Sequence, residues 1–180
     1  YKVFMVTPDK DFAQLVSDNI FMYRPARMGN GIEIWGVPEV QKRFEVKSPK
    51  QVIDYLGMMG DAVDNIPGLP GVGDKTAKKL LKTYGSMEAL LENAHEVKGK
   101  LGEKIEANKE QGILSKKLAT IILDVPVSFE AERYKLSKPD QIKVNNLFEE
   151  LEFRRISENF KKIFTSEGEA LTQEKNCLLY

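Results

Sequence analysis

A glycine- and proline-rich turn, followed at once by an amphipathic helix, constrains the fold of this chain more than any other feature. The turn is Gly68-Leu69-Pro70-Gly71-Val72-Gly73, and the pattern after it predicts a helix from Lys75 to Tyr84 that Gly85 ends. The helix repeats two faces at helical spacing, an apolar face of Ala77, Leu80, Leu81 and Tyr84 and a basic face of Lys75, Lys78, Lys79 and Lys82. One face is expected to pack, and the other to meet a partner.

The chemistry of the turn favours an anionic ligand. Gly71 and Gly73 can take positive φ and so let the backbone approach a ligand closely. The first N–H groups of the next helix lack partners and favour a phosphate. A plainer interpretation is that the lysines only hydrate a surface helix and the glycines only make a tight turn. The turn lies directly before the helix that carries the basic face, which we call the lysine stripe, and this coincidence favours binding of an anion.

The segment from Asn65 to Ala77 resembles the helix-hairpin-helix family, whose backbone grips DNA phosphates without reading bases. The resemblance implies binding of duplex DNA that is independent of sequence and sensitive to salt, with a monovalent cation at the hairpin. The DNA-binding residues expected here are Gly68, Gly71, Val72, Gly73, Lys75, Thr76, Lys78, Lys79 and Lys82.

Two pairs of aspartates are candidate metal ligands. Asp9 and Asp11 stand in the loop after a predicted strand, and Asp61 and Asp64 stand just before the hairpin. Each pair can direct two carboxylates toward one point, and such hard oxygen ligands suit Mg²⁺ or Mn²⁺. Aspartates are also common in loops and at helix starts, where they cap N–H groups, so either pair alone is a weak signal.

The segments Thr7 to Leu15 and Gly60 to Gly68, in their order and separation, resemble signatures of the 5′ nuclease domain of bacterial DNA polymerase I. The resemblance runs from about Val3 to Phe164. It implies an α/β, mostly helical fold, in which a partial mixed sheet is flanked by helices and followed by the helix-hairpin-helix region. It also implies that the catalytic carboxylates of a divalent-metal site are Asp9, Asp11, Asp61 and Asp64.

The reaction that the resemblance implies is two-metal hydrolysis of phosphodiester bonds at 5′ ends or flaps, during replication and repair. It needs no protein nucleophile, and the single histidine, His95, lies in a polar stretch away from both pairs. Lys10, between two aspartates, either contacts a DNA phosphate or balances their charge. The alternatives are a non-catalytic DNA-binding module and a purely structural domain. Four aspartates beside a polyanion favour the nuclease, because they would repel DNA unless metal were bound.

The periodicity predicts strands over residues 1–6, 20–23 and 31–35, the last two forming a hairpin around Pro25 to Asn30. A short helix should follow around Phe12, and a longer one should begin at Pro49, with Ser48 and Gln51 forming a capping box. Ser86 should cap another helix. Further helices are predicted over 99–109, 114–122, 140–152 and 155–164, and the last two should bury Leu147, Phe148, Leu151, Phe153, Phe160 and Phe164.

The predicted organisation is a metal-site subdomain over 1–60, a helical DNA-binding subdomain over 61–164, and a polar tail or linker over 165–180. The chain starts inside a strand at Tyr1, so we expect it to be cut from a longer protein. The polar tail fits a linker toward a polymerase domain, and the end of a stand-alone nuclease is the alternative. The N-terminal half of that parent would complete the acidic cluster, so the parent is expected to be the enzyme and this fragment alone to be inactive.

The composition sets the remaining limits. Lys plus Arg and Asp plus Glu number 27 each, so attraction of a polyanion must come from local segregation of charge. A chain with 42% hydrophobic residues should fold, and it contains no apolar run near the ~20 residues of a membrane span. A single cysteine, Cys177, excludes an internal disulfide and fits the cytoplasm.

Overall fold

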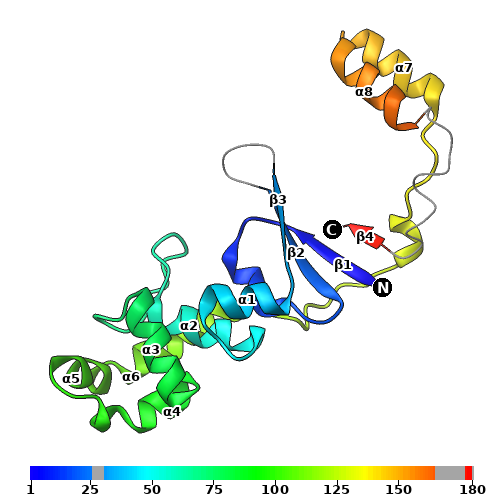
Figure 1. Cartoon of the computed structure of the whole chain (residues 1–180). Helices are drawn as coiled ribbons and strands as arrows, with labels where there is room; N and C mark the ends of the chain where they lie inside the picture. Colours follow the sequence, from blue (N-terminus) through cyan, green and yellow to red (C-terminus); the bar gives the residue numbers. More distant parts are fainter. Residues whose placement is uncertain (26–30, 165–176, 180) are drawn as a thin grey trace. The chain divides into compact units, whose positions relative to one another are not determined.

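The computed structural model describes residues 1–25, 31–164 and 177–179 (Figure 1). The chain divides into two compact units, one built mainly from Lys2–Pro126 and the other from Val127–Leu178. The first unit contains a small sheet and a cluster of helices, and it carries every residue of the candidate site.

The sheet of the first unit is mixed, as predicted. Strand β1 (Lys2–Val6) runs parallel to β2 (Ile20–Pro25), and β2 runs antiparallel to β3 (Ile32–Trp35). The 3₁₀ helix η1 (Lys10–Leu15) lies in the connection from β1 to β2. The predicted turn of the β2–β3 hairpin falls largely on residues 26–30, which lie outside the described residues.

Helix α1 (Val37–Phe44) follows β3 and was not predicted. Its signal was present in the sequence, because Val37, Val40 and Phe44 recur on one helical face and pack against the core. The Glu39 carboxylate accepts a hydrogen bond from the Gly36 N–H at 2.8 Å and so stabilises the start of the helix.

The predicted capping box before the next helix is wrong. The 3₁₀ helix η2 (Pro49–Gln51) precedes α2 (Val52–Met59), and the Ser48 side chain makes no capping hydrogen bond. Gln51 instead accepts from the Lys47 N–H at 2.7 Å and donates to the Gly85 carbonyl at 2.8 Å. The Oε1 atom, which a capping box would pair with the Ser48 N–H, thus accepts from the N–H one residue earlier.

The remaining elements of this unit are α3 (Asp74–Tyr84), α4 (Met87–Glu92), η3 (Ala94–Glu96), α5 (Lys100–Ala107) and α6 (Lys109–Ala119). Of these, α3, α4 and α6 pack on α2, while η3 packs on α5, which in turn contacts α6. Gly85 ends α3 in the left-handed region at φ 84°, and the Ser86 hydroxyl caps α4 by accepting from Ala89 N–H, both as predicted. Helix α6 begins at Lys109 rather than at residue 114.

Helices α2 and α6 approach each other closely at Gly57, where a Cβ atom would lie 2.8 Å from the Lys116 Cα. Beside this contact, the buried Asp54 carboxylate pairs with the Lys116 ammonium at 2.6 Å and accepts from the Met87 N–H at 2.9 Å. Lys116 also pairs with Glu88 at 2.7 Å. This polar network joins α2, α4 and α6 beside the apolar side chains that make up the rest of the core.

The second unit contains η4 (Ala131–Tyr134), α7 (Gln141–Glu150), α8 (Arg154–Phe164) and the short strand β4 (Cys177–Leu179). The ring of Phe160 contacts Phe148 at 5.6 Å and Phe164 at 4.5 Å between centroids. The prediction that the apolar residues of α7 and α8 are buried is wrong: Leu147 is 49% exposed and Phe153 is 41% exposed. Two short helices have only one shared face, which is too small to enclose six large side chains. The predicted tail lies outside the described residues except for 177–179.

Candidate metal centre and hairpin

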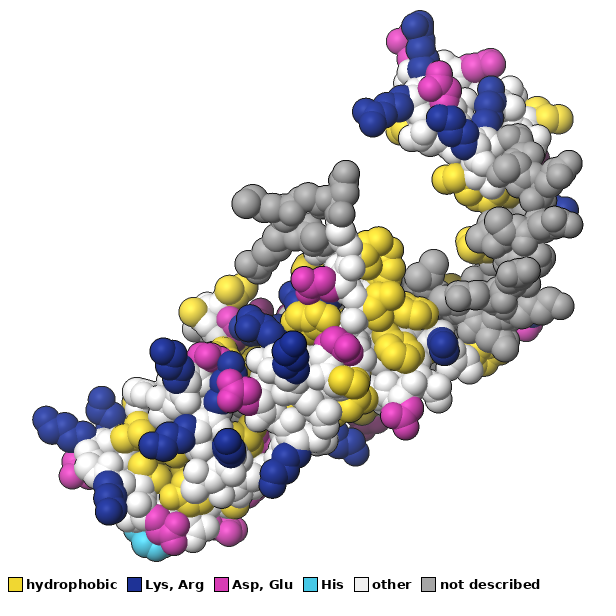
Figure 2. Space-filling model, in the orientation of Figure 1, with side chains coloured by type: hydrophobic (Ala, Val, Ile, Leu, Met, Phe, Trp, Pro, Cys, Tyr) yellow, Lys and Arg dark blue, Asp and Glu magenta, His cyan; other side chains and the backbone are white. Residues whose placement is uncertain are grey.

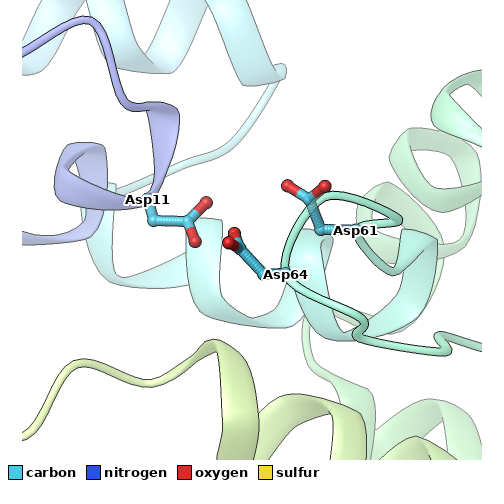
Figure 3. A group of neighbouring side chains, drawn as sticks. All are labelled: Asp11, Asp61 and Asp64. Atoms are coloured by element: carbon cyan, nitrogen blue, oxygen red, sulfur yellow. The ribbon is translucent and has the colours of Figure 1, made fainter.

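Three of the four predicted aspartates converge on one point. Asp11 comes from η1, and Asp61 and Asp64 come from the loop that follows α2; their carboxylate oxygens lie within 4.8 Å of one another. Figure 3 shows the Asp11 and Asp64 carboxylates pointing toward each other. Asp9 lies outside this group of three, and its Oδ1 accepts from the Asp11 N–H at 3.1 Å, which caps η1. Asp9 therefore fixes the backbone that carries Asp11.

The loop that carries Asp61 and Asp64 is closed by its own backbone. Asp61 and Ile66 exchange two backbone hydrogen bonds, with N···O distances of 2.9 and 2.8 Å. The Asp61 carboxylate accepts from the Val63 N–H at 2.9 Å, and Asn65 adopts a positive φ of 56°. The closed loop leaves Asp64 exposed and holds the Asp61 carboxylate at the cluster.

Gly60 and Gly68 join this loop to the hairpin. Both have positive φ, 76° and 66°, and a Cβ atom on Gly68 would lie 2.6 Å from the Gly60 nitrogen. Only residues without side chains allow this approach. The loop therefore cannot move far without moving the hairpin, which couples the carboxylate cluster to the turn.

The charges in the cluster shift two pKa values in opposite directions. Burial, followed by repulsion from the Asp9 and Asp64 carboxylates, raises the pKa of Asp11 to about 6. A hydrogen bond from Lys10, whose Nζ lies 2.5 Å from the Asp61 Oδ2, lowers the pKa of Asp61. The buried Asp11 Oδ1 has no hydrogen-bond partner among the described residues. An unpaired buried carboxylate oxygen within a group of like charges fits a divalent cation such as Mg²⁺ or Mn²⁺.

Gln14 positions η1, and the sequence reading gave it no role. It is buried; its Nε2 donates to the Asp11 carbonyl and to the Ala119 carbonyl, each at 2.9 Å, and its Oε1 accepts from the Ile121 N–H at 3.0 Å. These bonds tie the backbone of Asp11 to the end of α6. The sequence offered one indication of this role, since Gln14 lies within the Thr7 to Leu15 segment that resembles a nuclease signature.

The hairpin turn is closed by a hydrogen bond from the Val72 N–H to the Leu69 carbonyl at 3.0 Å. Gly71 uses its freedom to take a positive φ, 86°, whereas Gly73 does not and has φ −105°. Gly73 is the N-cap of α3, and an N-cap residue is extended. The Val72 side chain is buried, so only its backbone can face a ligand.

Helix α6 holds the start of the hairpin. Gly68 donates its N–H to the Ser115 hydroxyl at 3.0 Å, and its carbonyl accepts from the Gln111 amide at 2.7 Å. Ser115 is fully buried and in turn donates to the Gln111 carbonyl at 2.7 Å. The backbone of Gly68 is thus fully paired, which makes the entry into the turn rigid.

The lysine stripe of α3 is real but shorter than predicted. Lys75, Lys79 and Lys82 are exposed. Lys78 is half-buried and pairs with Asp74 at 3.0 Å and with Glu45 at 3.7 Å. Three lysines, rather than four, are therefore available to an anionic partner on this face.

The start of α3 also has no side-chain cap at Gly73. The Asp74 carboxylate turns instead to the Tyr55 hydroxyl, which donates to it at 2.6 Å. Burial and this hydrogen bond raise the pKa of Tyr55. The first N–H groups of α3 thus keep their donor capacity, and Thr76, half-buried in the first turn, lies among them.

Helix α5 adds a cation that the sequence reading did not assign to the turn. A Cβ atom on Gly71 would lie 3.8 Å from the Lys104 Nζ, so this ammonium lies beside the turn. Figure 2 shows several Lys and Arg side chains over the part of this unit that α3 to α6 form. The hairpin thus has basic side chains on both α3 and α5.

No helix in the described ranges combines the length and hydropathy that a membrane crossing requires.

Residues 47–142 match the family model described as "5'-3' exonuclease, C-terminal SAM fold". DNA polymerase I of Bacillus subtilis (strain 168) is 38% identical over 159 residues, which are 88% of this chain and 18% of that protein. The 5'-3' exonuclease of Aquifex aeolicus (strain VF5) is 37% identical over 164 residues, which are 91% of this chain and 54% of that protein. The chain belongs to the 5′-3′ exonuclease family, and it spans less than two thirds of these relatives.

The fold is also similar to that of T5 5′-exonuclease, in a structure with bound zinc ions. The TM-score is 0.57 at 20% sequence identity, over 66% of this chain and 42% of that chain. The predicted fold class, mostly helical with a small mixed sheet, is confirmed, as is the resemblance read from the two aspartate-containing segments.

Proposed function

We propose that this chain carries the metal-binding aspartates and the duplex-binding hairpin of a structure-specific 5′ nuclease. Its substrates would be 5′ ends or flaps, including RNA primers, in replication and repair. The observation that carries the proposal is the convergence of Asp11, Asp61 and Asp64 on a loop that the Gly60–Gly68 contact joins to the hairpin. A phosphate held at the hairpin would place its strand beside the carboxylates.

Asp11, Asp61 and Asp64 are the proposed metal ligands, and Asp9 supports them by capping η1. Two bound Mg²⁺ or Mn²⁺ ions would lower the pKa of a water molecule and stabilise the leaving oxygen of the phosphodiester. The chain itself keeps the carboxylates in place, with Gln14 holding η1 against α6. T5 flap endonuclease, whose fold is similar, has been solved in a complex with DNA and metal ions, which supports the assignment.

The proposed DNA contacts are backbone groups and cations. Gly71, at positive φ, allows close approach of a phosphate, and the N–H groups of the first turn of α3, which includes Thr76, can donate to it. Lys75, Lys79 and Lys82 extend the contact along α3, and Lys104 adds one from α5. We further propose a monovalent cation at the hairpin carbonyls. All of these contacts address the phosphate backbone, so binding should not depend on base sequence.

Catalysis is proposed for a protein of the relatives' length, because the chain spans 54% of the Aquifex exonuclease and 18% of the Bacillus polymerase. A polymerase domain in the same protein is part of this proposal. The competing function is a DNA-binding module without catalysis. The aspartate cluster disfavours it, because carboxylates that crowd together beside a polyanion weaken binding unless a cation neutralises them.

The test is Asp64→Asn in the full-length protein. We expect Mg²⁺-dependent cleavage of a 5′-flap substrate to fall roughly a hundredfold or more, while the affinity for the same duplex without metal stays unchanged. Asp18→Asn, at an exposed carboxylate outside the cluster, is the matched control. Unchanged cleavage by Asp64→Asn would contradict the metal assignment, and parallel loss of binding would indicate a structural role instead.

A further inference from the structure

One of the three clustered carboxylates, Asp61, forms an ion pair with Lys10. Lys10 belongs to η1, and Asp61 begins the loop after α2, so the pair joins the two elements that supply the three carboxylates. The Nζ lies 2.5 Å from the Asp61 Oδ2, while the Asp61 Oδ1 is occupied by the Val63 N–H. Lys10 therefore takes the Asp61 oxygen that is left for a metal ion.

The two partners differ in how freely they can move. The Asp61 side chain is only 9% exposed and belongs to a loop closed by backbone hydrogen bonds. The Lys10 side chain is 37% exposed, and its flexible stem can carry the ammonium into water. When a divalent cation reaches Asp61, the lysine is the partner that can leave.

We propose that Lys10 is a built-in placeholder for the divalent ion: its ammonium neutralises Asp61 in the metal-free protein and is displaced when the metal binds. The inference rests on the proposed metal site. It makes Lys10 a positioning residue that holds η1 and Asp61 at their places in the cluster before the ion arrives. The released ammonium is then available to a phosphate of the bound strand, so charge balance and phosphate contact become successive roles of one side chain.

The placeholder role predicts whether removal of Lys10 raises or lowers the affinity for the metal ion. Because the lysine competes for the Asp61 oxygen and also repels a cation, Lys10→Met should bind Mn²⁺ about threefold to tenfold more tightly than the wild type. If Lys10 were instead a permanent support that the bound ion needs, the same substitution would weaken binding. The two roles therefore predict opposite changes in Mn²⁺ affinity.

The experiment is a titration of the full-length protein, as in the Asp64→Asn test, with Mn²⁺, in which the electron paramagnetic resonance signal of the free ion gives the dissociation constant. Lys50→Met removes the same charge at an exposed position in η2 and serves as the control, expected to match the wild type. Equal or weaker Mn²⁺ binding by Lys10→Met overturns the placeholder role. Absence of Mn²⁺ binding in both proteins overturns the metal site itself, which distinguishes the two failures.

Thermal unfolding provides a second readout that a merely structural lysine would not give. In excess EDTA, Lys10→Met should unfold at a lower temperature than the wild type, because Asp61 then loses its ion-pair partner and Asp11 loses a neighbouring positive charge. With saturating Mn²⁺ the difference should close or reverse, because the ion has taken over the role of the ammonium. A difference of the same size in both conditions would show that Lys10 stays on Asp61 and would refute the displacement.

Discussion

Replacing Asp11 by asparagine should stabilise the metal-free protein at neutral pH. Asp11 is partly buried, lies among other carboxylates and has an oxygen without a partner among the described residues. Asparagine keeps the size and shape of the side chain and removes the charge, and its amide can donate to a neighbouring carboxylate. The substitution therefore relieves repulsion that a metal ion would otherwise relieve.

The magnitude follows from the pKa of Asp11, which rises from 3.8 to about 6. A shift of this size sets an upper limit of roughly 3 kcal/mol on the destabilisation by the charged form at neutral pH. Since the side chain is only partly buried, solvent screening reduces the expected gain for Asp11→Asn to about 1–2 kcal/mol. This is a large fraction of the stability of a small domain.

The sign of the pH dependence is fixed by which state binds the proton more tightly. Between the unfolded pKa of 3.8 and the folded pKa of about 6, the folded protein holds the Asp11 proton more tightly than the unfolded chain. The advantage of Asp11→Asn should therefore be complete above about pH 7 and should disappear as the pH falls toward about 4.

The assay is urea unfolding in EDTA across this pH range, with Asp18→Asn as an exposed control that should track the wild type. Adding Mn²⁺ at neutral pH should reverse the order, because the wild type gains more from the ion than the variant does. An Asp11→Asn protein that is less stable than the wild type at neutral pH in EDTA would refute the reasoning.

Four further substitutions have expected outcomes. Gly68→Ala, which forces a Cβ atom to within 2.6 Å of backbone at positive φ, should destabilise the chain by about 2–4 kcal/mol in urea unfolding. Gly73→Ala, with open space around the Cβ position, should change stability by less than about 1 kcal/mol, and equal effects would contradict the crowding. Lys116→Met should cost about 2–4 kcal/mol, because the buried Asp54 then loses its cation; a neutral effect would show that the pair contributes nothing. Lys104→Ala should flatten the logarithmic salt dependence of duplex binding, measured by fluorescence anisotropy, by about one unit, and an unchanged slope would remove it from the interface.

Local chemistry was predictable where the residue itself limits the backbone. Gly71 adopts positive φ, Gly85 ends α3 and Ser86 caps α4, because each of these outcomes depends on one or two neighbouring residues. Predictions that depended on distant partners were less secure. Lys78 pairs with Glu45, which is distant in the chain, and is therefore not available on the lysine stripe.

The burial of apolar residues likewise depends partly on local pattern and partly on distant neighbours. The apolar face of α3 was read correctly, because other helices of its unit cover it; Leu80 and Leu81 are buried. The apolar residues of α7 and α8 follow an equally clear helical pattern, yet none of them is buried within those helices. A pattern determines which face of a helix is apolar, while the neighbouring elements determine whether that face is covered.

The sequence by itself determined the residue types of the candidate site: two aspartate pairs, the glycines of the hairpin and the lysines that follow it. Only the tertiary structure decided which of them meet. Packing of η1 against α2, together with the Gln14 hydrogen bond to Ala119, brings Asp11 to Asp61 and Asp64, leaves Asp9 as a cap and places Lys10 on Asp61. Turns and caps depend on neighbouring residues, whereas convergence across the chain depends on the shapes of packed helices, which periodicity does not contain.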